Sequence, residues 1–317
     1  MKLPELKIGT KIARVPIMQG GMAIRLSTGA LAAAVANQGG IGLIAASGMT
    51  PQELRYEIRM ARSLSKGIIG INIMFAAKKF AEMVNTAIDE GIDLVVAGAG
   101  FSRDIFALGK ASGTPVVPIV SSVKLAKISQ RLGAAAIVVE GKEAGGHLGT
   151  DQSIKEIIPD IVAAVDIPVI AAGGIADGRG VAAAFMLGAE GVQMGTRFLS
   201  ANECTIHPVY KEKILKATDL CTMVTGKRLG HPVRSLRTQF AREYSKAEYG
   251  GMPDEELEAL ATGALRLAVQ EGDNEKGCFL SGQIAAMVKK EQPAAEIVKE
   301  VMEEAEPILL RASQWVR

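Results

Sequence analysis

Residues 167–180 read IPVIAAGGIADGRG and contain the clearest structural signal of the sequence. An unbroken apolar run indicates a strand that is buried on both faces, as in a parallel sheet. Paired glycines at the end of such a strand let backbone N–H groups approach a phosphate, and the N-terminus of a following helix adds a partial positive charge. The stretch therefore predicts a strand–helix unit that carries a phosphate site.

The same alternation of strand and helix extends through the first 200 residues of the chain. Short apolar runs bounded by Gly or Pro predict strands at Val15–Gln19, Ile41–Ala45, Ile68–Ile73, Leu94–Ala97, Val116–Val120, Ala136–Glu140, Pro168–Ala172 and Gly191–Met194. Helices are expected between them at Gly29–Asn37, Pro51–Ser65, Ala76–Glu90, Ser102–Ala111, Ser122–Leu132, Ile154–Val165 and Arg179–Leu187. This many units favours a closed (β/α)8 TIM barrel, an α/β fold, over a doubly wound open sheet.

The alternation ends after the eighth predicted strand. Residues 201–279 are richer in charge and show no convincing strand, and helical stretches are expected near Tyr210–Ala217, Val233–Lys246 and Asp254–Gln270. We therefore expect a barrel domain built from residues 1–200 and 280–317, and a helical insertion at 201–279. An insertion placed there lies on the catalytic face and can act as a lid. Ser281–Lys290 is predicted to be the amphipathic helix that completes the barrel, and Ala294–Trp315 a C-terminal surface helix.

Composition and charge exclude several classes of protein. The 36 Lys and Arg residues nearly balance 34 Asp and Glu residues, and no basic stripe indicates a nucleic-acid partner. No apolar stretch approaches the length of a membrane span or a signal core, so we expect no membrane partner and a cytoplasmic protein. Neither the three cysteines nor the three histidines have ligand spacing, and no disulfide framework or metal site is expected.

Further small and polar residues follow the predicted strands. Gln193, Gly195 and Thr196 give a second glycine turn and a hydroxyl group beside the first turn, and loops after strands seven and eight form the common phosphate site of this fold. Tight strand–helix turns alone are the alternative reading. Gly21 after strand one leaves room for a flat ring system, and Asn72 at the end of strand three can bond the polar edge of a heterocycle.

His147 stands among glycines beyond the sixth predicted strand, in the sequence EGKEAGGHLG of residues 140–149. A histidine with a near-neutral pKa suits proton transfer, and the flanking glycines let a substrate or cofactor come close. A structural or surface histidine is the alternative. The position favours a functional role for His147.

Taken in order, these motifs resemble the nitronate monooxygenase (2-nitropropane dioxygenase) superfamily, whose other well-known branch is the flavin-dependent enoyl-acyl-carrier-protein reductase. The resemblance covers nearly the whole chain. It implies an FMN-binding barrel with a helical lid, with the isoalloxazine over the mouth and the phosphate on the glycines of strands seven and eight. His147 matches the catalytic histidine of the family. The implied cofactor-binding residues are Gly21, Met22, Asn72, Lys124, Glu140, Gly145, Gly146, Gly173, Gly174, Gln193, Gly195, Thr196, Ser281 and Gly282.

The two branches differ in what the resemblance implies about the reaction. Residues 224–234 and 277–283, VTGKRLGHPVR and GCFLSGQ, look closer to the enoyl reductases, which take hydride from NADH or NADPH and deliver it to a C=C bond conjugated to a carbonyl. The substrate side departs from that pattern at Ala23, Ile24 and Arg25, where an aromatic residue is usual, and at Phe101, which replaces part of an Asn-Pro turn. We therefore expect these four residues to contact a small-molecule substrate, either an enone, an enoyl thioester or a nitronate.

The alternatives to a reductase are a nitronate monooxygenase, in which His147 stands beside a nitronate, and a non-catalytic module that binds flavin or phosphate. The resemblance is also compatible with a homodimer.

Overall fold

The fold of this chain is a closed barrel of eight parallel strands. A computed structural model describes residues 3–75, 79–98 and 100–312. Around the barrel the strands follow the order β10-β11-β3-β4-β5-β6-β7-β8. They are β3 (Ile17–Gln19), β4 (Ile41–Ala45), β5 (Ile68–Met74), β6 (Leu94–Gly98), β7 (Val116–Val120), β8 (Ile137–Glu140), β10 (Val169–Ala172) and β11 (Gly191–Met194). The (β/α)8 prediction is confirmed, and the open sheet is excluded.

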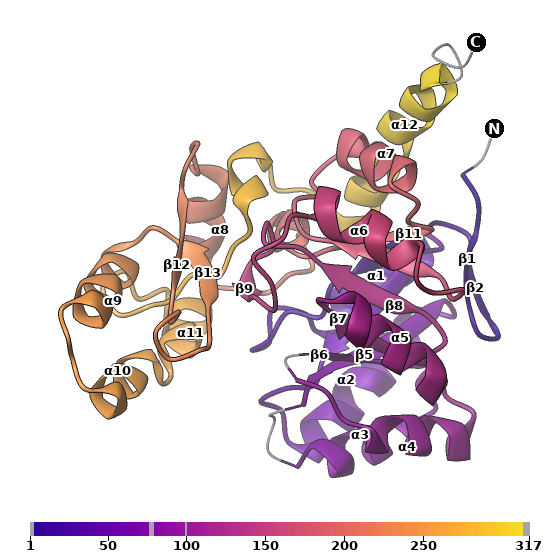
Figure 1. Ribbon diagram of the computed structural model, residues 1–317, viewed down its shortest axis with the longest axis horizontal. Helices are drawn as coiled ribbons and strands as arrows, with labels where there is room; N and C mark the ends of the chain where they lie inside the picture. Colours follow the sequence, from indigo (N-terminus) through magenta and orange to yellow (C-terminus); the bar gives the residue numbers. More distant parts are fainter. Residues whose placement is uncertain (1–2, 76–78, 99, 313–317) are drawn as a thin grey trace.

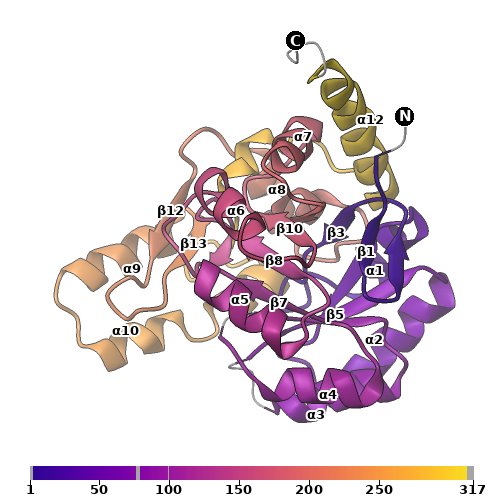
Figure 2. The ribbon, with the colours of Figure 1, turned by 45° about the vertical axis from the view of Figure 1, so that its right-hand side comes forward.

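Helices surround the barrel on its outside (Figure 2). They are α1 (Gly29–Asn37), α2 (Pro51–Leu64), α3 (Phe80–Asp89), α4 (Asp104–Ser112), α5 (Val123–Leu132), α6 (Ile154–Val162) and α7 (Gly178–Met186). The start of the helix predicted at Ala76–Glu90 lies outside the described residues, as does the end of the one predicted at Ala294–Trp315. No helix of the described ranges is long and apolar enough to cross a bilayer.

The eighth outer helix is not the one that the sequence predicts. Residues 281–290 contain only a short 3-10 turn, η3 (Gln283–Met287), while α12 (Ala294–Ala312) packs against α7 and α1. Ile297, Val298 and Val301 of α12 are buried in this contact region. The prediction of a helix at Ser281–Lys290 is wrong. The start of this segment forms backbone hydrogen bonds to the loop after β8 instead of within a helix, since the Gln283 N–H donates to the carbonyl of Glu143 at 3.0 Å.

A hairpin that the sequence did not predict, β1 (Leu6–Ile8) and β2 (Lys11–Ala13), covers the end of the barrel opposite the mouth (Figure 1). Leu6 and Ile8 are fully buried and pack with Met18 and Leu43 in the interior cluster of the barrel. The hairpin therefore completes the core, and it lies with the end of α12 on the side of the molecule away from the insertion (Figure 1).

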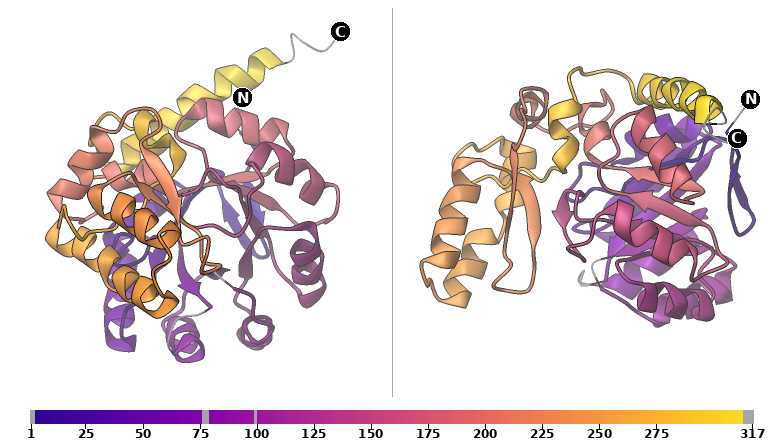
Figure 3. Two further views of the ribbon diagram at one scale, coloured as in Figure 1. Left: turned by 60° about the vertical axis from the view of Figure 1, so that its left-hand side comes forward. Right: turned by 45° about the horizontal axis from the view of Figure 1, so that its top comes forward.

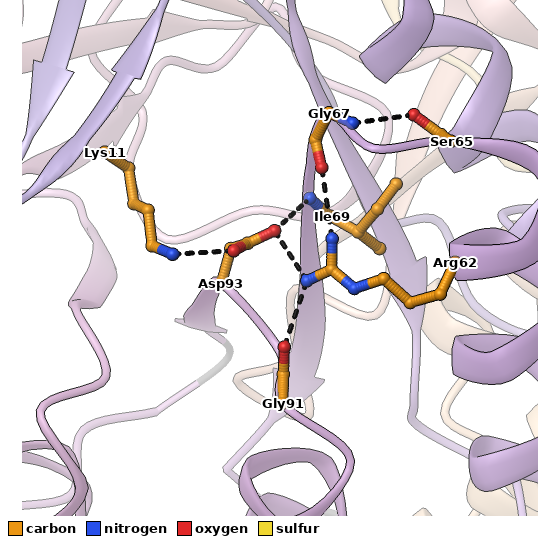
Figure 4. Close-up of polar contacts among 7 residues, drawn as sticks. All are labelled: Lys11, Arg62, Ser65, Gly67, Ile69, Gly91 and Asp93. Carbon is orange, nitrogen blue, oxygen red and sulfur yellow. Dashed lines mark hydrogen bonds and ion pairs between the residues drawn. The ribbon is translucent and has the colours of Figure 1, made fainter.

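Asp93 fastens the hairpin to the barrel (Figure 4). Its carboxylate accepts hydrogen bonds from Lys11 Nζ at 2.7 Å, Arg62 Nη2 at 2.6 Å and the N–H of Ile69 at 2.9 Å. Burial opposes ionisation of Asp93, but these three donors outweigh it and lower the pKa of the carboxyl group. The network therefore joins β2, α2, β5 and the start of β6.

The segment after β11 contains strands as well as helices (Figure 3). Its elements are η1 (Thr196–Ser200), α8 (Pro208–Leu215), β12 (Thr222–Thr225), β13 (Val233–Leu236), α9 (Gln239–Tyr249), α10 (Asp254–Ala261), α11 (Ala264–Arg266) and the π turn η2 (Leu267–Glu271). β13 pairs with β12 on one side and with β9 (Gly146–His147) on the other. The prediction of a segment without strands is wrong, and Val233–Leu236 is a strand rather than the start of a helix. Its strand pairing, which depends on β9 in the distant barrel loop, outweighs the local helix-forming composition.

Candidate functional site

The ends of β3, β5 and β11 meet at the mouth of the barrel. The Gly20 N–H donates to the carbonyl of Met194 at 2.9 Å, and Asn72 Nδ2 donates to the carbonyl of Gly21 at 3.1 Å. A Cβ atom on Gly21 would lie 2.1 Å from Cβ of Asn72, so only glycine fits there. Gly21 and Asn72, which are predicted site residues on different strands, are thus brought together.

Two amide oxygens near this mouth lack a hydrogen-bond partner within the described residues. Asn72 Oδ1 and Gln193 Oε1 are buried, and neither has a hydrogen-bond partner in the described part of the chain. Buried polar atoms in proteins are nearly always paired, so each unpaired one requires an explanation. Acceptors placed at the ends of β5 and β11 suit the N–H edge of a heterocycle, and in this respect the residues fit a flavin ring.

Three distant segments converge at a second part of the mouth. The Gly282 N–H donates to Thr196 Oγ1 at 2.9 Å. A Cβ atom on Gly145 would lie 2.5 Å from the carbonyl carbon of Ser281 and the nitrogen of Gly282. Gly145, Thr196, Ser281 and Gly282 therefore form one cluster, as the predicted cofactor site requires. Gly146 adjoins it at the start of β9.

The glycine turn after β10 packs against the loop after β8. Gly173 and Gly174 have φ values of +97° and +75°, which side chains rarely adopt. A Cβ atom on Gly173 would lie 3.1 Å from the nitrogen of Ala144, and one on Gly174 would lie 3.1 Å from Cβ of Glu143. Gly195 is more open, since its added Cβ would only touch Met22 Sδ at 3.5 Å. The turns leave backbone exposed where the sequence predicts a phosphate.

One part of the phosphate prediction is wrong, because the N-terminus of α7 already holds carboxylates. The N–H of Gly178 donates to Glu304 Oε2 at 3.0 Å. Asp177 Oδ1 accepts from the N–H groups of Arg179 and Gly180 at 3.0 and 3.2 Å. These bonds engage the donors of the first turn and neutralise the partial positive charge of this helix end. A phosphate at the mouth would be held by the glycine turns rather than by α7.

Glu140 ends β8 inside the mouth and is half-buried. Desolvation of its carboxylate raises the pKa to about 8. A carboxyl group that is protonated at neutral pH can donate a hydrogen bond as well as accept one. Glu140 can therefore bond a polar ring atom without bringing a negative charge to it.

His147 lies on β9, directly opposite Val233 of β13. Its side chain is exposed at the rim of the mouth. The protein atoms packed around the imidazole desolvate it in part, which lowers the pKa of His147, and repulsion from His231 lowers it further. Both effects favour the neutral imidazole, which can accept a proton at one ring nitrogen while its N–H donates a hydrogen bond.

The other predicted residues lie around the rim, without a shared contact. Lys124 is exposed in the first turn of α5. Ala23 and Ile24 are half-buried in the loop after β3, and Arg25 in the same loop forms an ion pair with Glu53 near the start of α2. Phe101 packs on Phe106, with ring centroids 6.0 Å apart, and so is held partly in the core.

Three residues of this region were missed by sequence reasoning. Phe75 follows β5 and is 42% exposed, with its ring edge-on to Phe80. The rule that functional side chains follow strand ends could have found it, since a strand was predicted just before it. Arg234 and His231 lie in the insertion, and no local signal in the sequence places them beside the barrel.

No group of three potential metal ligands occurs within residues 3–75, 79–98 and 100–312.

Comparisons with known proteins define the class to which this barrel belongs. The nitronate monooxygenase family model matches residues 5–304, and the chain belongs to that family. The predicted family resemblance is thus confirmed, and the protein is an oxidoreductase of the superfamily that also contains FabK-type enoyl reductases.

Individual relatives come from both branches of the superfamily. The structure of FabK from Thermotoga maritima is 42% identical with a TM-score of 0.92, covering 96% of this chain and 97% of that one. A probable nitronate monooxygenase of Staphylococcus aureus (strain Newman) is 30% identical over 93% of this chain and 95% of its own length. Nitroalkane oxidase from Streptomyces ansochromogenes is 25% identical with a TM-score of 0.84, covering 94% of this chain and 97% of that one.

Proposed function

We propose that this protein is an FMN-dependent reductase that uses NADH or NADPH to reduce a C=C bond conjugated to a carbonyl group, in an enone or an enoyl thioester. The observation that carries the cofactor assignment is the pair of buried, unpaired amide oxygens of Asn72 and Gln193 at the mouth. The identity to FabK, 42% against 30% and 25% for the two relatives from the other branch, favours the reductase assignment.

In this proposal different residues at the mouth contact different parts of the cofactor. Asn72, Gln193 and protonated Glu140 bond the polar edge of the flavin ring. The backbone turns at Gly173, Gly174, Gly195 and Thr196 hold its phosphate, with Lys124 at the rim as a further cation, and Met22, Gly145, Ser281 and Gly282 shape the space around it. The bound flavin supplies two-electron redox chemistry.

His147 is the proton-handling residue of this proposal. Its neutral imidazole donates a hydrogen bond to the substrate carbonyl oxygen and relays the proton that the α-carbon of the substrate acquires. Ala23, Ile24, Arg25 and Phe101 stand on the substrate side of the mouth. The segment 201–279 is the lid, which excludes water from the reacting atoms.

Nitronate monooxygenase activity is the second candidate function, and the family match over residues 5–304 favours it. In that case His147 stands beside a nitronate, and oxygen is the electron acceptor. Aerobic turnover of an alkyl nitronate without any nicotinamide separates the two activities. We expect no oxygen consumption under those conditions, whereas rapid nitronate-dependent consumption would assign the protein to the monooxygenase branch.

A further inference from the structure

A second histidine from the insertion stands beside His147. β9 and β13 pair so that His147 lies opposite Val233, and the N–H of Leu148 donates to the carbonyl of Pro232 at 2.9 Å. His231 precedes Pro232 at the end of the turn that joins β12 to β13. The pairing therefore brings His231, two residues before β13, near His147 at the rim of the mouth, although 83 other residues separate them in the sequence.

The backbone of this turn is fixed from inside the insertion. Glu248, only 1% exposed, accepts hydrogen bonds from the N–H groups of Gly226 at 3.0 Å and Arg228 at 2.8 Å. The His231 N–H donates to the carbonyl of Gly226 at 3.0 Å, and a Cβ atom on Gly226 would lie 2.5 Å from the carbonyl oxygen of His231. The turn therefore holds His231 in place, and its free N–H groups are used by Glu248 rather than offered to an anion.

We propose that His231 is a positioning residue for His147: the paired segments bring the two imidazoles close together at the rim of the mouth, where protonation of one opposes protonation of the other. This inference rests on the proposed role of His147 as a proton-handling residue. It assigns the insertion a direct part in the chemistry, beyond that of a cover.

Electrostatics around His147 support the pairing. Burial lowers the pKa of His147, and repulsion from His231 lowers it further, since two cationic imidazoles at close range disfavour each other. The charged groups on the surrounding elements are Glu140, Lys142, Glu143, Asp151, Lys227, Arg228 and Arg234.

Several of these groups have other partners. Arg228 bonds the Glu248 backbone carbonyl at 2.9 Å, and Arg234 bonds that of Lys142 at 2.8 Å. The Glu143 carboxylate accepts from the N–H of Ile154 at 3.2 Å. Besides desolvation, the group that lowers the pKa of His147 is His231.

The test uses the small number of histidines in the chain, which is three. Proton NMR follows the imidazole Cε1–H signals of the full-length protein, as purified and without substrate, from about pH 5 to 9. Replacement His231→Asn removes the repulsion, and the titration midpoint of His147 is expected to rise. Replacement His231→Lys supplies a permanent charge, and the midpoint is expected to fall. His207, whose Nδ1 accepts from the N–H of Val209 at 3.2 Å, is the internal reference and is expected to stay unchanged.

If His231 acted only by supporting the structure, both replacements would move the titration midpoint of His147 in the same direction. Opposite shifts of the midpoint therefore indicate an electrostatic effect of His231. Lys227→Gln, which removes an exposed charge from the same turn, is the matched control and is expected to leave His147 unchanged. If His231→Lys does not fold, His231→Arg carries the same charge and takes its place. If the titration midpoint of His147 stays the same in both variants, or shifts in the same direction in both, the proposal is wrong. Because no substrate is present, this result is independent of whether the reductase assignment holds.

Discussion

Arg234 Nη2 donates to the main-chain carbonyl of Lys142 at 2.8 Å, and Nε of the same guanidinium donates to that oxygen at 3.2 Å. The bond joins β13 of the insertion to the loop that connects β8 with His147. Arg234 is only 9% exposed, and its Nη1 also bonds Thr222 Oγ1 at 3.2 Å. The orientation of His147 therefore depends on how the insertion docks.

Replacement Arg234→Lys removes the planar guanidinium donors. An ammonium group cannot bond both the Lys142 carbonyl and Thr222 Oγ1 in the same geometry. Loss of hydrogen bonds from a buried charged group costs about 1.5–3 kcal/mol, or roughly tenfold or more in the docked population. We expect faster proteolytic cleavage within residues 201–279 and a turnover lowered by about that factor. Arg237→Lys is the control, since the Arg237 side chain is exposed and its guanidinium donates to the carbonyl of Thr222 at only 3.4 Å. Identical cleavage of both variants would show that Arg234 does not hold the insertion.

Replacement Gly174→Ala is expected to weaken flavin binding more than it weakens the fold. A φ of +75° costs alanine about 1–2 kcal/mol of backbone strain. The new Cβ would also lie only 3.1 Å from Cβ of Glu143. Gly133→Ala is the control, because Gly133 has a φ of +95° but open space around it. We expect similar losses in the free energy of unfolding and a lower flavin content only in Gly174→Ala. Equal flavin content in the two variants would show that Gly174 does not contribute to the phosphate site.

Glu140 gives the flavin-free protein a pH dependence of stability. The pKa of its carboxyl group is raised by burial from 4.5 to about 8, so between these pH values the folded chain holds a proton that the unfolded chain has released. Stability is therefore expected to fall as the pH rises through this window, by at most about 1.4 kcal/mol per pH unit, and to level off above it. In Glu140→Gln this contribution is absent. Denaturation curves of both proteins across the window provide the measurement, and parallel pH profiles would contradict the raised pKa.

Replacement His147→Ala is expected to leave a yellow, flavin-bound protein whose turnover falls by about 10²-fold or more, as is typical when a general acid–base group is lost. His207→Asn is the matched control, because asparagine can still cap α8 and His207 lies outside the mouth. Flavin absorbance and steady-state rates of the two variants are compared. Unchanged turnover in His147→Ala would exclude this histidine from the mechanism.

Local patterns in the sequence were sufficient for the barrel strands, and long-range contacts account for what they missed. Ile41–Ala45, Val116–Val120 and Gly191–Met194 are strands with the predicted bounds, since buried parallel strands are continuous apolar runs. The β1–β2 hairpin has only three residues in each strand, too few for a periodic signal. β13 forms a sheet with the distant β9, which no local pattern reveals.

The candidate site shows the same division. Gly145, Thr196 and Gly282 were found by their motifs, and the structure brings them together. The helix end at Gly178 looked free in the sequence, but Glu304 bonds its N–H, and the two residues are 126 positions apart. His231 was noted only as part of the insertion, because its position beside His147 depends on strand pairing.

Anaerobic stopped-flow absorbance near 450 nm measures whether the barrel mouth binds FMN and carries out a nicotinamide-driven reduction. The purified protein is mixed first with NADH or NADPH and then with enones, enoyl thioesters or nitronates. We expect bleaching by a nicotinamide and recovery of the oxidised flavin absorbance on mixing with an activated alkene. Bleaching by nitronates alone, or a protein without FMN, would contradict this expectation.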